Sequence, residues 1–117
     1  VEMWHRRMEL EGMQPTADAV RNSIGFFTNR ALAGPLDFEQ IPALAERGLK
    51  RIDLFQGLLD ERLADNRYVA GDDFSIADIA GLIAIDFGKL VKKRVGGETP
   101  NLKRWYDEVS ARPSARA

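Results

Sequence analysis

Apolar residues recur every three or four positions along most of this chain, which is the spacing of one face of an α-helix. Four segments carry the pattern: residues 1–33, 39–65, 75–91 and 100–112. No long alternation of apolar and polar residues and no Asn-Gly turn indicates a β-hairpin. The pattern predicts an all-α fold, a bundle of four to five helices, in a single domain over residues 1–117.

The first segment contains residues that disturb a helix. Gly12 and Pro15 lie within it, and a proline inside a helix removes a backbone donor and clashes with the preceding turn. We therefore expect a kink or a break between Gly12 and Pro15. Beyond this point the helical face continues with the apolar residues Ala17, Val20, Ile24, Phe27 and Ala31. Gly34 and Pro35 then predict a loop over residues 33–38.

The other three segments differ in how much of their surface is apolar. Residues 39–65 have one regular apolar stripe, which predicts a helix with a single buried face. Residues 75–91 are apolar on nearly all sides, so we expect a central helix that is buried all round. Residues 100–112 start at a proline and end before another, and present Leu102, Trp105, Tyr106 and Val109 on one face.

The strongest local signal is a complete helix start at Ser75. The Ser75 side chain can cap the helix, and the Asp78 carboxylate can reach back to the Ser75 N–H, which makes a capping box. Phe74 and Ile79 have the spacing of a hydrophobic staple. A buried helix depends on such a box because water cannot reach its first backbone donors. We interpret Asp78 as a structural residue, and keep a catalytic acid as the minor alternative.

Composition excludes several classes of site. Lys and Arg number 17 against 18 for Asp and Glu, so the chain lacks the basic excess of a general nucleic-acid binder. With no cysteine and one histidine, it offers neither thiol chemistry nor a thiolate or multi-histidine metal site. No apolar run reaches the roughly 20 residues of a membrane span. We expect a cytoplasmic protein with no metal, nucleic-acid or membrane partner.

Several motifs resemble the C-terminal domain of glutathione transferases, and they follow one another along the chain in the order found in that domain. The capping motif Gly71-x-x-Phe74-Ser75-x-x-Asp78 is similar to the start of the buried helix of that domain. The other matching stretches are Val1-Glu2-Met3-Trp4 with Arg6 and Arg7, Tyr68-Val69-Ala70-Gly71, Pro100-Asn101-Leu102-x-x-Trp105 and Ala111-Arg112-Pro113. The resemblance covers almost the whole chain and implies an all-helical domain of a two-domain enzyme.

The resemblance also implies an activity and its division between two domains. In the family, an N-terminal thioredoxin-like domain binds most of the glutathione and activates its thiol. The helical domain supplies a pocket for an apolar electrophile and part of a homodimer interface. This sequence has no segment that resembles the thioredoxin-like domain, so we expect a fragment that is inactive alone. The activating residue has no counterpart here, and no catalytic residue is assigned.

Two sets of residues are implied as contacts. Glu9 and Glu11 lie in the stretch from which an acidic residue reaches the glutathione of the partner subunit in several classes of the family. Solvated surface charges are the plainer interpretation of this pair. Met13, Thr16 and Val20 match the stretch that lines the electrophile pocket, and ordinary core packing is equally compatible with them.

Two other functions stay open. Relatives of the family use the same helical domain as a non-catalytic protein-interaction module. An unrelated effector domain of a regulator would require a basic helix-turn-helix, which this chain does not contain. Because fold does not fix function, the enzyme hypothesis depends on the resemblance.

Overall fold

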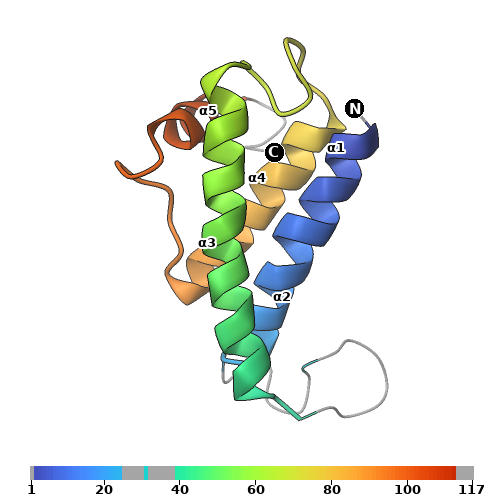
Figure 1. Ribbon diagram of the computed structural model, residues 1–117, viewed down its shortest axis with the longest axis vertical. Helices are drawn as coiled ribbons and strands as arrows, with labels where there is room; N and C mark the ends of the chain where they lie inside the picture. The colour runs from blue at the N-terminus through green and yellow to red at the C-terminus, as the bar shows by residue number, and fades with distance from the viewer. Residues whose placement is uncertain (1, 25–30, 32–38, 113–117) are drawn as a thin grey trace.

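The computed structural model describes residues 2–24, 31 and 39–112, and every regular element in that part of the chain is helical (Figure 1). In the loop before α4, Tyr68 and Gly71 form one isolated antiparallel bridge. The prediction of an all-α bundle is confirmed. The elements are α1 (Glu2–Arg7), the π-helix η1 (Met8–Met13), α2 (Gln14–Arg21), α3 (Pro42–Ala64), α4 (Ile76–Gly88), the 3-10 turn η3 (Lys89–Val91) and α5 (Pro100–Ser110).

The first three elements form one continuous structure, which we call the N-terminal rod (Glu2–Arg21). Of the predicted kink or break between Gly12 and Pro15, the break is wrong, because a wider π turn carries the helix through this stretch. In that turn the Gln14 N–H bonds to the carbonyl of Glu9, five residues back. Pro15 occupies the first turn of α2, where a missing backbone donor is tolerated.

The rod ends at Arg21, whereas the sequence predicted a helix as far as residue 33. The buried Asn22 terminates it. Its amide nitrogen donates to the carbonyl of Asp18 at 2.8 Å, and its amide oxygen accepts from the N–H of Ile41 at 2.9 Å. One side chain thus ends the rod and fixes the entry to α3. Of the predicted continuation, Phe27 and the loop at 33–38 lie outside the described residues.

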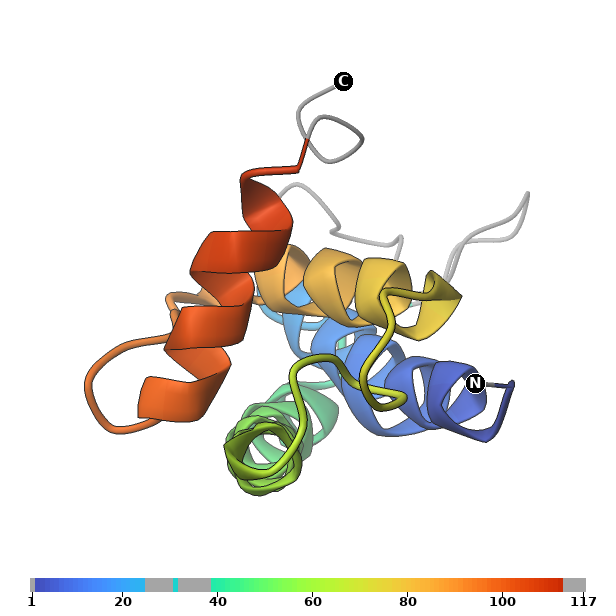
Figure 2. The same ribbon diagram turned by 90° about the horizontal axis from the view of Figure 1, so that it is seen from above.

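The rod packs against α3 on one side and α4 on another, and α5 contacts both α3 and α4 (Figure 2). A core forms between these helices from side chains with almost no exposed surface. Trp105 of α5 lies at its centre, fully buried. Around it lie side chains from η1, α3, the loop before α4, α4 and α5, among them Met8, Phe55, Leu59, Leu63, Val69, Leu82, Ile85, Leu102 and Val109.

Helices α2 and α3 approach each other very closely at one glycine. A Cβ atom at Gly48 would lie 2.6 Å from the carbonyl oxygen of Pro15 and 2.8 Å from the backbone nitrogen of Ala19. Both neighbours are backbone atoms, so no side-chain rotation could relieve the clash. Gly12 makes a similar approach to the ring of Phe55. These glycines set the spacing between the rod and α3.

The prediction that α4 is buried all round is wrong. Ile76 and Ile83 are each 52% exposed and Ile79 is 45% exposed, although other faces of the helix are buried. These positions share one helical face that neither the rod nor α5 covers. The sequence shows that α4 is apolar on this face, and within the described residues the face is only partly covered.

Gly48→Ala should destabilise the bundle by about 1–3 kcal/mol, because the added methyl group forces α2 and α3 apart. Gly57 lies in the same helix, and a Cβ there would meet nothing within 4 Å. Gly57→Ala is therefore the matched control, and it should stabilise by about 0.5–1 kcal/mol through the higher helix propensity of alanine. Urea unfolding of both variants measures the contrast. Equal midpoints would contradict the close-packing account.

Candidate functional site

Helix α4 begins with the capping box read from the sequence. The Ser75 hydroxyl oxygen accepts from the N–H of Ala77 at 3.2 Å, and the Asp78 carboxylate accepts from the N–H of Ser75 at 2.9 Å. Ser75 has the extended backbone of an N-cap residue. The first donors of a largely buried helix are thus satisfied within its own sequence.

Asp78 does more than cap, because its side chain is fully buried and accepts from three parts of the chain. One carboxylate oxygen accepts from the N–H of Val69 at 2.9 Å and from the indole N–H of Trp105 at 2.8 Å. The other oxygen accepts from Ser75. This carboxylate has no exposed surface and its oxygens are occupied by donors, so the geometry favours a structural role over that of a catalytic acid.

Phe74 and Ile79, the two residues of the predicted hydrophobic staple, lie in different surroundings. The ring of Phe74 lies edge-on to Tyr68 with 5.8 Å between centroids, and the Arg112 guanidinium lies 3.8 Å from the Phe74 ring centre. Ile79 is half-exposed and lines a groove. A contact between Phe74 and Ile79 stays a prediction.

A groove of about 380 Å³ runs between the N-terminal rod and α4. We call it the isoleucine groove. Ile76, Ile79, Ala80 and Ile83 form its α4 wall. The rod contributes Met13 and, at the polar edge, His5 and Glu9, whose side chains approach to 3.3 Å between Nε2 and a carboxylate oxygen. This is an apolar surface with few polar groups, the usual composition of a site for small apolar molecules.

The structure separates the residues that the sequence grouped. Met13 and Glu9 line the isoleucine groove. Thr16 and Val20 are fully buried, and the Thr16 hydroxyl donates to the carbonyl of Gly12 at 2.7 Å. Glu11 faces the other side of the rod, where it pairs with Arg7 at 3.0 Å. The two acidic residues therefore serve different surfaces.

A second hollow, of about 230 Å³, lies on the side of the rod that faces α3. We call it the leucine hollow. Leu54, Phe55 and Leu58 form its apolar part, and Glu11 and Arg51 form its charged edge. Leu54 is 73% exposed, more than any other exposed large apolar side chain in the described part.

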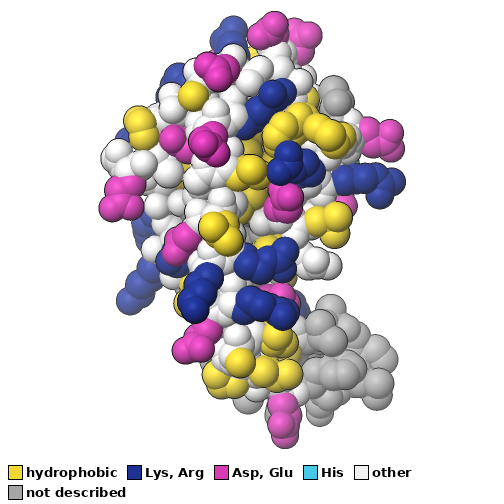
Figure 3. All heavy atoms as spheres, in the orientation of Figure 1, with side chains coloured by type: hydrophobic (Ala, Val, Ile, Leu, Met, Phe, Trp, Pro, Cys, Tyr) yellow, Lys and Arg dark blue, Asp and Glu magenta, His cyan; other side chains and the backbone are white. Residues whose placement is uncertain are grey.

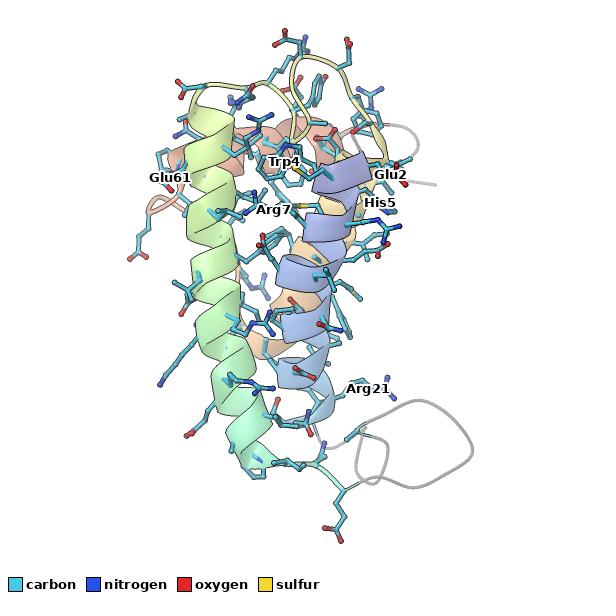
Figure 4. All side chains as sticks on the ribbon, turned by 45° about the vertical axis from the view of Figure 1, so that its right-hand side comes forward. Glu2, Trp4, His5, Arg7, Arg21 and Glu61 are labelled. Carbon is cyan, nitrogen blue, oxygen red and sulfur yellow. The ribbon has the colours of Figure 1, made fainter. Side chains whose placement is uncertain are left out.

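Elsewhere in the bundle, contacts between aromatic and charged side chains link neighbouring helices. Near the top of the rod, Trp4 lies between the guanidinium groups of Arg7 and Arg62, at 4.6 and 4.7 Å from its ring (Figure 4). On the other side of the bundle, the Tyr106 hydroxyl donates to Asp86 at 2.6 Å.

Tyr106 is a poor source of a phenolate. Burial, followed by the hydrogen bond with Asp86, raises the pKa of its phenol. The ammonium group of Lys89 also bonds to this hydroxyl and acts in the opposite direction. Because the net direction is upward, the hydroxyl keeps its proton and donates it to Asp86, and these contacts link α4 to α5.

No group of three or more His, Asp or Glu side chains in the described part of the chain could hold a metal ion. No helix in the same part of the chain is long and apolar enough to cross a membrane.

The fold and its capping motif agree with one known family. The family profile described as glutathione S-transferase, C-terminal domain, matches residues 23–113. Glutathione S-transferase 2 of Saccharomyces cerevisiae is 30% identical over 119 aligned residues, which cover 99% of this chain and 48% of that protein. The chain belongs to the glutathione S-transferase family, and its matched part is the C-terminal domain.

Solved structures give the same result. The crystal structure of Gtt2 from Saccharomyces cerevisiae superposes with a TM-score of 0.85 at 28% identity, covering 98% of this chain and 53% of that one. A class Gtt2 glutathione S-transferase of Vibrio parahaemolyticus superposes with a TM-score of 0.72 at 30% identity, covering 99% and 49%. The chain thus spans about half the length of these relatives.

Asp78→Asn should destabilise the chain by about 2–3 kcal/mol, because the amide replaces one acceptor oxygen and turns an NH₂ group toward a backbone donor. Ser75→Ala removes one capping bond and should cost less, about 1 kcal/mol. Denaturant unfolding of both variants measures the two losses in unfolding free energy and shows which is larger. The network described for Asp78 would be refuted by an Asn variant as stable as the parent chain.

Proposed function

We propose that the full-length protein is a cytoplasmic, detoxifying glutathione transferase that conjugates glutathione to an apolar electrophile. Membership of the family supports the reaction class, and the isoleucine groove supports an apolar co-substrate. In this proposal the chain provides the helical domain of a two-domain enzyme. It holds the electrophile, while the remainder of the protein binds most of the glutathione and lowers the pKa of its thiol.

The groove contributes by proximity rather than by supplying a reactive group. An electrophile held against Ile79, Ile83 and Met13 would be positioned for attack by a thiolate bound in the neighbouring domain, which replaces a bimolecular encounter by a local one. Met13 suits such a wall because its flexible thioether adapts to ligands of different shape. Thr16 and Val20, lying beneath the surface, would support the wall rather than touch the ligand.

We also propose that the remaining domain of the full-length protein packs on the exposed face of α4. Ile76, Ile79 and Ile83 form an apolar strip beside the groove, and surfaces of this kind mark interaction sites. The relatives are about twice as long as this chain, so a domain of similar size is available to cover the strip. The groove would then lie at the junction of two domains, a common place for ligand sites.

The two acidic candidates fit different parts of the proposed dimer. Glu9 lies at the edge of the groove of its own chain, beside His5. Glu11 lies on the face of the leucine hollow, from which a contact with the glutathione of a second subunit would come. We propose a homodimer for the full-length protein, with part of its interface on this domain.

A non-catalytic interaction module is the second candidate. The exposed isoleucines favour it, since the same strip could bind a segment of another protein. Catalysis in the full-length protein distinguishes the two functions.

The full-length protein should accelerate the conjugation of glutathione to an aromatic electrophile such as chlorodinitrobenzene, whereas the 117-residue chain should not. The chain lacks a nucleophile–base arrangement in its described part, and the generation of a thiolate near neutral pH requires one or a positive field. Absorbance of the conjugate follows both reactions. Turnover by the short chain would reassign the chemistry to this domain, and an inactive, folded full-length protein would favour the interaction module.

The 117-residue chain should bind an apolar dye, anilinonaphthalene sulfonate, in the isoleucine groove. Ile79→Ala removes part of the groove wall and should weaken the binding several-fold, because apolar contact area is lost. Leu90 is similarly exposed but does not line the groove, so Leu90→Ala is the control and should leave binding unchanged. Fluorescence titration gives both affinities. An equal effect of the two substitutions would refute the groove as the binding site.

A further inference from the structure

Helix α5 begins at a charged side chain that helix α3 supplies. Its N-cap residue, Thr99, makes no capping hydrogen bond with its own side chain within the described residues. One carboxylate oxygen of Asp60, in α3, takes this place: it accepts from the N–H of Asn101 at 2.9 Å and from the N–H of Leu102 at 3.0 Å. Two of the first backbone donors of α5 are thus satisfied from 41 and 42 positions earlier in the chain.

Helix α3 ends, in turn, at a charged side chain that α5 supplies. The guanidinium of Arg104 donates to three carbonyls there, those of Leu63 at 3.0 Å, Asn66 at 3.2 Å and Arg67 at 3.4 Å. The last carbonyls of a helix have no partner within it, and the negative end of the helix dipole attracts a cation. Asp60 and Arg104 therefore form reciprocal caps, because each lies in one helix and caps the other.

A second set of contacts links the same two elements one turn further along α5. A carboxylate oxygen of Glu108 accepts from the Arg67 guanidinium at 2.7 Å and from the Tyr68 hydroxyl at 3.3 Å. Lys, Arg, Asp and Glu side chains lie intermixed over the upper left part of the molecule in Figure 3, where Figure 1 shows α5 beside the end of α3. Polar contacts thus cover this junction, and the buried Trp105 lies beneath them.

The connection from α4 to α5 is loosely packed. Gly96 and Gly97 lie in it, and a Cβ at either position would meet nothing within 4 Å. Helix α5 itself has 11 residues, fewer than the roughly 12–15 below which isolated helices are marginal in water. If α5 leaves α3, it should therefore lose its helical structure, and the connection allows it to do so without moving α4.

We propose that α5 and the last turn of α3 (residues 61–64), together the α3–α5 unit, unfold and refold as one while the rest of the bundle stays folded. The reciprocal caps are the reason. When α5 leaves, Asp60 loses the amides that it caps, and Arg104 leaves the carbonyls of α3. Both helix ends thus lose their caps in a single step, and each end is stable only while the other is in place.

The contacts beneath the unit favour its closed state. Opening withdraws the indole N–H of Trp105 from the fully buried carboxylate of Asp78, which is left short of one donor. A buried charge that loses a hydrogen bond is costly. Opening also breaks the bond from Tyr106 to Asp86, but this bond is exposed and water can replace it. The unit should therefore be closed most of the time and open as a reversible local unfolding event.

Native-state hydrogen exchange of the 117-residue chain at several low urea concentrations tests the unit. The amides of α5 and of residues 61–64 should share one opening free energy and one urea dependence. Both values should lie below those of the amides of Ile52 and Phe55, which are buried in the middle of α3 and exchange by global unfolding. Different urea dependences for the two segments, or exchange of both only by global unfolding, would overturn the inference.

Substitution of either cap should affect both segments. Asp60→Ala should lower the protection factors of α5 and of residues 61–64 about tenfold, the effect of a lost N-cap. Its control is Glu61→Ala, since Glu61 is exposed and lies on the outer side of α3 in Figure 4. Arg104→Gln should act like Asp60→Ala. Its control is Lys103→Gln, because the Lys103 ammonium pairs with Asp107 within α5, at 2.8 Å. Both controls should leave the protection factors nearly unchanged.

A rescue variant separates capping from packing. Thr99→Asp in the Asp60→Ala chain places a carboxylate at the N-cap position of α5 itself, and it should restore most of the lost protection in α5 and in residues 61–64. Loss of protection confined to the substituted segment, or rescue confined to α5, would show that the two ends are capped independently and would overturn the inference. Circular dichroism checks that each variant is folded. Conjugation by the full-length protein tests the proposed function separately.

Discussion

The buried carboxylate of Asp78 is the interaction on which the rest of the bundle depends. It binds the first turn of α4, the backbone of the loop at Val69 and the indole of Trp105 in α5. The loop before α4, the first turn of α4 and helix α5 therefore meet at one side chain, and Trp105 reaches it from 27 residues away. A charge without solvent contact is costly unless its hydrogen bonds are complete, so the arrangement is specific as well as stabilising. The core around Trp105 and the wall of the isoleucine groove are both built on the helix that Asp78 fixes.

Features that the sequence predicted correctly are those decided by neighbouring residues. The capping box needs only Ser75 and Asp78 three positions apart, and the buried face of α5 needs only the period of Leu102, Trp105 and Val109. The end of the first helix was predicted twelve residues too late, because the apolar spacing continues beyond Arg21. What stops the helix is a tertiary contact, the bond from Ile41 to Asn22, and no local pattern reveals it.

The candidate site was predicted in outline but not in detail. Met13, Thr16 and Val20 share one side of an ideal α-helix, yet only Met13 reaches the groove. Thr16 and Val20 lie further along the rod in α2, where that helix packs against α3, α4 and η3, and this tertiary packing is not visible in a period of 3.6 residues. The isoleucines of α4 were assigned to the core because their chemistry is that of core residues. Their exposure depends on which faces of α4 the rod and α5 cover, and the apolar pattern of α4 alone does not show that.

The N-terminal rod is only one helix thick. The isoleucine groove lies on one side of it and the leucine hollow on the other, so the two sites share one wall. Met13 lines the groove, and the adjacent Gly12 presses its backbone against the ring of Phe55, which lines the hollow. A ligand that displaced the rod on one side would press on the Phe55 ring on the other. Any energetic coupling between ligands on the two faces would pass across this one helix, through Gly12 and Phe55, and would act equally in both directions.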